Sequence, residues 1–154
     1  MTPAAHCFAL AAAAKTGALS TLARDPPGYP YASLVAIAFD GSGRPLLCLS
    51  RLAEHTQNLG LRPEASLLVT EVVEGDALAA GRMTILGECR RVDAAEEAAS
   101  QTTFLLAHPE AARYASFSDF AMYRLEPMSA RWIAGFGRMS WLGAEEYAGE
   151  WRSE

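Results

Sequence analysis

The stretch Leu49-Ser50-Arg51-Leu52-Ala53-Glu54-His55-Thr56-Gln57-Asn58-Leu59 follows an apolar hairpin and opens a short predicted helix. It brings a guanidinium, hydroxyls, an imidazole and an amide into about three turns of chain. A junction from strand to helix also leaves backbone N–H groups free and places the positive end of the helix dipole there. Because anions bind readily at such a junction, the stretch predicts a phosphate site if these side chains converge.

The hairpin before this stretch is predicted by its alternation and its turn. Residues 31–39 are extended and apolar, with bulky side chains on one face and small ones on the other, and residues 45–49 return as the partner strand. Asp40-Gly41-Ser42-Gly43 supplies the residues that a tight turn requires. Since neither face of residues 31–39 is polar, we expect this strand to be buried on both sides, as in a closed barrel.

The rest of the chain alternates between short strands and a few helices. Further strands are expected at residues 18–22, 65–73, 82–92, 120–126 and 130–136, the last two separated by Pro127. Helices are expected at residues 2–14, ending near Lys15-Thr16-Gly17, at 52–61, and from an Asp93 N-cap with a Glu96 capping box to Ala107. Without repeated strand–helix–strand units, this order predicts a mainly β fold. We expect a single domain, residues 1–154, built as an antiparallel β-barrel of about six strands with peripheral helices.

Composition excludes several classes of function. The net charge is −5 with no basic stripe, which argues against nucleic-acid binding. No stretch reaches the ~18 apolar residues of a membrane span. Cys7, Cys48 and Cys89 are odd in number and widely spaced, so we expect free thiols in a reducing cytoplasm rather than disulfides or a zinc site. The sequence thus predicts a soluble, cytoplasmic protein without a metal site.

The candidate chemical groups leave alternatives open. His55 is either a catalytic or a capping histidine, and no Ser/His/Asp set accompanies it. His6 and His108 have no metal-ligand spacing with it. Arg82 and Thr84 share one face of a strand, where they either reach a ligand together or form an exposed polar rim. The segment 135–138 (Gly-Phe-Gly-Arg) lacks the third glycine of a dinucleotide fingerprint.

Several segments resemble, in their order and their amino-acid sequence, the pyridoxamine 5′-phosphate oxidase-like, FMN-binding split-barrel family. The resemblance covers about residues 15–142, by the order of its segments, and its last segments resemble the haem-utilisation branch. It is carried by Gly17–Leu22, Gly28–Val35, Ser50–Leu59, Pro63–Leu67, Arg82–Gly87, Tyr123–Pro127 and Ala134–Arg138.

The resemblance implies a six-stranded split barrel that forms a homodimer with two FMN molecules at the subunit interface. It implies a site in three parts. The FMN phosphate and ribityl chain would be surrounded by Ser50, Arg51, His55, Thr56 and Asn58; neighbouring strands would contribute Ser33, Arg82 and Thr84; and the partner subunit would contribute Trp132 and Arg138.

Three family features have no counterpart in this sequence: the C-terminal basic substrate site, the C-terminal histidine of haem-degrading members, and the second domain. We therefore expect an FMN-binding oxidoreductase with an unidentified small substrate, electron donor and catalytic residue. The alternatives are a flavin- or haem-binding carrier or sensor without turnover, and a haem-utilisation protein.

Overall fold

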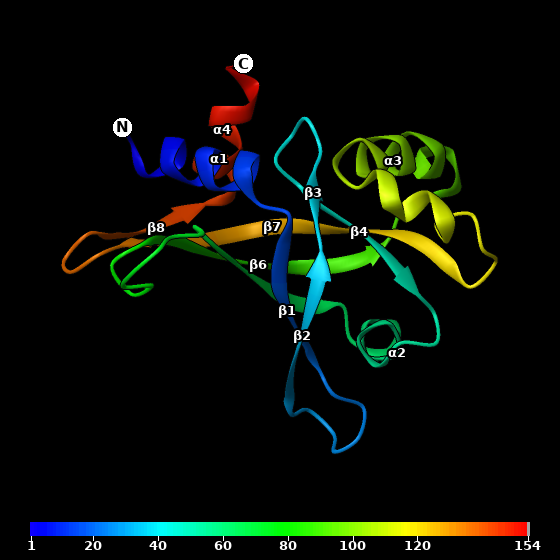
Figure 1. Cartoon of the computed structure of the whole chain (residues 1–154). Coiled ribbons are helices and arrows are strands. Elements are labelled where there is room, and N and C mark those ends of the chain that lie inside the picture. Colours follow the sequence, from blue (N-terminus) through cyan, green and yellow to red (C-terminus); the bar gives the residue numbers. More distant parts are fainter. Residues whose placement is uncertain (154) are drawn as a thin grey trace.

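The computed structural model describes residues 1–153. Helices and strands follow one another along the chain, with a single 3-10 turn, η1, near the middle (Figure 1). The elements are α1 (Pro3–Ala13), β1 (Thr16–Leu22), β2 (Pro30–Ala36), β3 (Ala38–Phe39), β4 (Pro45–Ser50), α2 (Glu54–Leu61), β5 (Glu64–Thr70), β6 (Gly81–Arg91), α3 (Ala94–Ala107), η1 (Pro109–Arg113), β7 (Phe120–Ala134), β8 (Met139–Gly143) and α4 (Ala144–Arg152).

The strands form one antiparallel sheet that curls on itself. Their order is β2-β1-β5-β6-β7-β4-β3, and β8 pairs with β7 beside β4. The two ends of this path, β2 and β3, are consecutive parts of the chain with Ile37 alone between them. The chain itself therefore joins both edges of the sheet, and the predicted mainly β split barrel with peripheral helices is confirmed (Figure 1).

The strand count differs from the expected barrel of about six strands, for which seven extended segments were predicted. Residues 1–153 contain eight strands, because the stretch 31–39 divides at Ile37 and β8 is additional. Conversely, the two strands expected on either side of Pro127 form the single strand β7. Pro127 is tolerated because β7 shifts register against β6 here, and neither β4 nor β8 pairs with residues 125–128. The missing N–H therefore falls where β7 has one neighbour.

The expectation that residues 31–39 are buried on both sides is wrong for their first half. Leu34 is 77% exposed and Tyr31 is 39% exposed, whereas Ile37 is fully buried. The exposed residues belong to the β1–β2 hairpin, which extends beyond the barrel (Figure 1). An apolar strand therefore leaves the core here, and its side chains remain available on the surface.

Two helix ends differ from the sequence prediction. Helix α1 ends at Ala13, and Gly17 lies inside β1, where a Cβ would meet Leu67 and the Leu68 carbonyl. This glycine therefore allows close strand packing rather than a helix cap. Helix α3 begins after Asp93 as expected, but Asp93 makes no side-chain cap bond. The expected capping box is absent because the Glu96 carboxylate pairs with Arg124.

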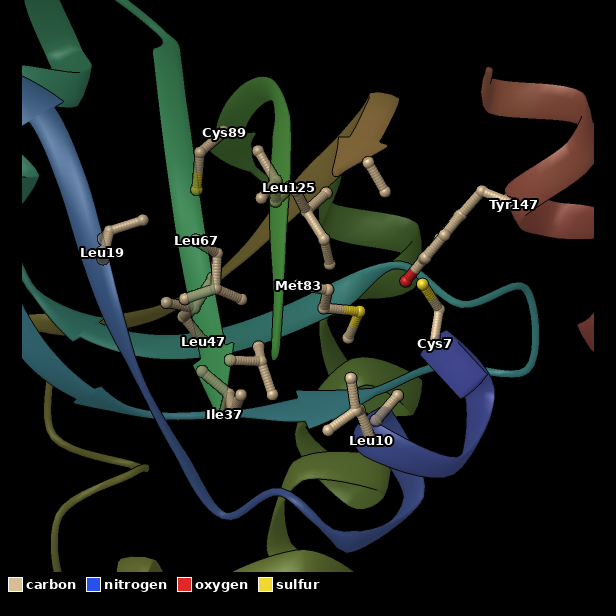
Figure 2. Close-up of a cluster of buried hydrophobic side chains, with 14 of the residues drawn as sticks. Cys7, Leu10, Leu19, Ile37, Leu47, Leu67, Met83, Cys89, Leu125 and Tyr147 are labelled. Atoms are coloured by element: carbon tan, nitrogen blue, oxygen red, sulfur yellow. The ribbon is translucent and has the colours of Figure 1, made fainter. Parts of the chain in front are cut away.

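The core fills the barrel and continues beneath α1 and α4 at one end (Figure 1). Figure 2 shows Leu19, Leu67 and Leu47 gathered between strands, with Cys7 of α1 pointing toward Tyr147 of α4. The Tyr147 hydroxyl donates to the Gly43 carbonyl at 2.7 Å, so α4 is fixed to the β3–β4 turn. A second cluster packs α3 against β3 and β4. No helix among residues 1–153 has the length and apolar character needed to cross a bilayer.

Candidate functional site

His55 and Ser33 meet at the junction that the sequence singled out. His55 lies in the first turn of α2, directly after the connection from β4, and its Nδ1 is 3.1 Å from Ser33 Oγ on β2. Burial lowers the pKa of the His55 imidazole below its ordinary value, which favours the neutral ring. When Nδ1 carries the proton and donates to Ser33, Nε2 keeps its lone pair. No hydrogen-bond partner for Nε2 is present in residues 1–153.

A pocket of about 260 Å³, here the His55 pocket, opens beside this imidazole. Its walls are mainly apolar side chains and backbone of β2, β4 and the segment before β7, with the Cys48 thiol among them. Burial, and then the Glu97 carboxylate, raise the pKa of that thiol to about 11, so it is protonated near neutrality. The lining residues are Leu34, Val35, Ala36, Cys48, Leu49, Ser50, Ala53, His55, Tyr114 and Phe120.

The Ser50 hydroxyl is occupied within the protein. It donates to Asp119 Oδ2 at 3.0 Å and accepts from the Leu52 N–H at 3.2 Å. Arg51 is exposed and has no ion pair within residues 1–153. The start of α2 has no side-chain cap, since its N-cap residue is Ala53. The junction thus keeps one unpaired guanidinium and free N–H groups, opposed by the Asp119 carboxylate.

Thr56 and Asn58 face the protein interior rather than the pocket. Asn58 is fully buried, accepts from the Arg24 N–H at 3.1 Å and donates to Thr21 Oγ1 at 3.0 Å. The Thr56 hydroxyl is also buried, and no partner for it is found in the described chain. In this protomer neither side chain is displayed to a ligand in the His55 pocket.

Arg82 and Thr84 lie on the outer face of the sheet, opposite the buried Met83. Arg82 donates to the carbonyls of Leu78 and Ala80 at 2.8 and 3.4 Å. Thr84 belongs to a row of directly paired residues that crosses six strands, because side chains of paired residues share a face. This outer row consists of Leu34, Ala18, Leu68, Thr84, Arg131 and Trp141.

Trp132 and Arg138 are separate from the His55 pocket and lie under α1. The Trp132 indole is 5% exposed and stacks on His6 of α1, with ring centroids 4.7 Å apart and planes 13° apart. Arg138 Cζ lies 5.5 Å from the centroid of the same indole, and Nη2 lies 3.4 Å from His6 Nε2. These residues line a cavity of about 680 Å³, here the α1 cavity, which shares no residue with the His55 pocket.

The structure therefore separates the predicted site residues into groups. Ser50 and His55 line one pocket, Ser33 contacts the His55 imidazole, and Arg51 follows Ser50 in the chain. Sequence reasoning missed Asp119, which no local motif marks. It also missed the role of His6, although this histidine interrupts an alanine-rich helix and offered a signal. No group of three or more His, Cys, Asp or Glu that could hold a metal ion is present in residues 1–153.

These observations define a mainly β split-barrel protein with a histidine pocket where β4 leads into α2. The family model described as "CREG, beta-barrel" matches residues 2–149, and the chain belongs to this family. The likeness to split barrels of the pyridoxamine phosphate oxidase type is confirmed as well. A putative pyridoxamine 5′-phosphate oxidase from Listeria innocua superposes with a TM-score of 0.64 at 13% identity, over 86% of this chain and 98% of the other, which shows a shared fold.

Two proteins with higher sequence identity to this chain have haem in their names. The "Non-canonical heme oxygenase HOZ, chloroplastic" of Arabidopsis thaliana is 35% identical over 134 residues, which are 87% of this chain and 40% of that protein. A heme binding protein from Mycobacterium smegmatis superposes with a TM-score of 0.90 at 36% identity, over 97% of this chain and 61% of the other. The chain thus spans less than two thirds of either relative.

Proposed function

We propose that this protein binds haem and that His55 supplies the ligand to the iron. The observation that carries the proposal is the Ser33–His55 pair beside an apolar pocket. A histidine that ligates haem iron must be neutral with one free nitrogen, and it is usually oriented by a hydrogen bond on its other nitrogen. Burial of His55 and its Ser33 contact provide both conditions.

The other two histidines fit this role less well. His108 is 5% exposed, and its Nε2 lies 2.7 Å from the Ile37 carbonyl, so that nitrogen is already engaged. His6 is stacked on Trp132 and its Nε2 faces Arg138. His55 lines a pocket and has an Nε2 without a hydrogen-bond partner in residues 1–153, whereas the Nε2 of His6 contacts Arg138 and that of His108 contacts the Ile37 carbonyl.

The names of the relatives support haem as the occupant. The plant relative is named as a haem oxygenase and the mycobacterial protein as a haem-binding protein. Bound haem would supply redox chemistry at its iron, while Arg51 would offer its guanidinium to a haem carboxylate. Arg51 is exposed and directly follows Ser50, which lines the pocket, and this is consistent with the pairing.

A homodimer would complete the site. The His55 pocket of about 260 Å³ is smaller than the roughly 300–1,000 Å³ of typical ligand sites, so a macrocycle extends beyond it. Leu34 lines the pocket and also begins the outer row, where Leu34 and Trp141 are 77% and 58% exposed. Two such faces placed together would bury apolar surface and cover the pocket mouth.

Titration with ferric haem tests the proposal. The wild-type protein should develop a saturable Soret band at one haem per chain, and His55→Ala should lose the His-ligated spectrum and bind at least tenfold more weakly. His6→Ala is the matched control and should keep both spectrum and affinity. An unchanged spectrum and affinity in His55→Ala would exclude His55 as the ligand.

The same haem complex can be tested for catalytic breakdown of haem. Ascorbate in air supplies electrons and oxygen to the bound haem. Loss of the Soret band with iron released to a ferrous chelator would make the protein an enzyme of haem breakdown. A stable band would assign it to haem binding alone.

FMN is the second candidate. The unpaired Arg51 guanidinium and the uncapped start of α2 favour its phosphate, whereas the Ser50–Asp119 hydrogen bond opposes it because a carboxylate would face the anion. FMN would supply hydride or electron transfer at its ring. Yellow protein that releases flavin on denaturation would support FMN, and Arg51→Ala should then weaken it by about 1.5–3 kcal/mol. Colourless protein that takes up no added FMN would exclude it.

A further inference from the structure

We propose that the α1 cavity is a second ligand site, separate from the His55 pocket, and that it takes a planar aromatic monocarboxylate. The cavity lies between α1 and the adjoining parts of β5, β6 and β7. Its volume of about 680 Å³ falls within the range of small-molecule sites, roughly 300–1,000 Å³. It is built entirely within one protomer and shares no lining residue with the His55 pocket.

Small side chains create the space. The last two turns of α1 contribute Ala9 and Ala13 to the cavity lining, the C-cap residue Ala14 follows them, and Ala134 adds to the lining from the end of β7. Larger side chains at these positions would fill the volume, since the core of the barrel is otherwise closely packed. The alanine-rich face of α1 thus provides an apolar wall without polar groups.

An aromatic surface forms another wall. Trp132 is held flat against His6 at a plane angle of 13°, and both rings line the cavity. Trp132 is 5% exposed and supports the His6 ring, which is only half-buried. The His6 ring can therefore stack on a planar ligand at little entropic cost, because packing already orders it. This wall selects a flat, apolar molecule.

The charged residues that line the α1 cavity favour an anionic ligand. The charged residues of the lining are Lys15, Arg138 and Glu71, which leave an excess of one positive charge. Glu71 Oε2 accepts the Gly81 N–H at 3.0 Å and so has a local partner. No carboxylate lies within ion-pair distance of Lys15 or Arg138 in residues 1–153. A single carboxylate matches this balance, and a guanidinium is well suited to bind it.

Calorimetry with 2-naphthoate tests the site, and 2-naphthamide is the matched neutral probe. Naphthoate should bind one per chain and at least tenfold more tightly than the amide. Arg138→Gln should weaken naphthoate about tenfold, whereas Arg131→Gln, which lies over Trp141 on the outer face, should leave it unchanged. Absence of naphthoate binding, or equal affinity for the amide, would overturn the proposal.

Filling the cavity provides a test that does not depend on charge. Ala13→Leu should reduce naphthoate affinity at least tenfold, while Ala12→Leu, an exposed neighbour on α1 outside the cavity, should have no effect. Equal affinities of the two variants would place the probe elsewhere. The protein saturated with haem should bind naphthoate as the haem-free protein does. Displacement of naphthoate by haem would make the cavity part of the haem site and overturn a separate site.

Discussion

Ser33 holds the imidazole on which the proposed haem site depends, through a contact of 3.1 Å. Ser33→Ala removes this partner, so the ring loses its fixed orientation and its preferred tautomer. Residues that hydrogen-bond to a ligating histidine typically contribute roughly 10- to 100-fold in affinity, and we expect a loss in about that range in a haem titration. Ser66→Ala, a serine on β5 away from the pocket, is the control. Wild-type affinity in Ser33→Ala would show that the hydrogen bond does not prepare the ligand.

Asn58 has a structural role within this chain. Asn58→Ala leaves the Arg24 N–H and the buried Thr21 hydroxyl without their partners. Unsatisfied buried groups cost about 1–3 kcal/mol each, so unfolding in urea should show a loss of about 2–6 kcal/mol. The exposed neighbour Gln57→Ala should change stability by less than about 0.5 kcal/mol. A fully stable Asn58→Ala protein that loses cofactor would instead make Asn58 a ligand contact.

The rate at which Cys48 is alkylated, and its dependence on pH, test the environment of this residue in the His55 pocket. Burial and the Glu97 carboxylate raise its pKa from 9.0 to about 11, so the thiolate fraction at pH 8 falls about a hundredfold. Alkylation by iodoacetamide, mapped by mass spectrometry, should be slower by that factor than in urea, and its rate should rise until about pH 11. Bound haem should slow it further because Cys48 lines the pocket. A rate that levels off near pH 9 would contradict this prediction.

At the scale of elements, we expect alanine substitutions at Gly87 and Gly60 to change the stability of the protein in opposite directions. A Cβ at Gly87 would overlap the Glu126 carbonyl oxygen where β6 and β7 shift register. Gly87→Ala should therefore destabilise the protein by about 1–3 kcal/mol or more. Gly60 lies in α2 with open space around it, so Gly60→Ala should stabilise by about 0.5–1 kcal/mol. Thermal and urea unfolding measure both, and a tolerated Gly87→Ala would show that the two strands can separate there.

The elements also show what sequence alone can predict. Helix α3 follows its sequence prediction, since it begins directly after Asp93, although this side chain makes no cap bond, and ends before His108-Pro109. By contrast, β8 is five residues long, and its place is set by pairing with β7 rather than by its own pattern. The two strands form a hairpin whose turn includes Gly135 and Gly137 at positive φ, and the sequence prediction did not use this turn. The merger of two expected strands across Pro127 was not predictable, because it depends on pairing of β7 with β6, which is distant in sequence.

The candidate site, like the fold, could be predicted from the sequence only in part. The segment 50–59 predicted a junction of strand and helix, and the structure places Ser50 and His55 there. Its sequence could not indicate that Thr56 and Asn58 point inward, because helical rotation against β1 decides this. Nor could it pair Ser50 with Asp119, since the two residues are 69 positions apart. Residue types predicted the kind of chemistry, whereas tertiary packing decided which side chains reach a ligand.

At the scale of the whole molecule, a substitution in the outer row tests for the homodimer that would complete the proposed haem site. Leu68 lies in the middle of this row and is 38% exposed, whereas Leu106 on α3 is 80% exposed and lies outside the sheet. The wild-type protein should sediment at twice its chain mass of 16.5 kDa. Leu68→Glu would place two carboxylates in the interface, and their desolvation should shift the protein toward monomer. Leu106→Glu should remain dimeric. A monomeric wild type, or a Leu68→Glu variant that stays dimeric and binds haem normally, would remove the outer row from the interface.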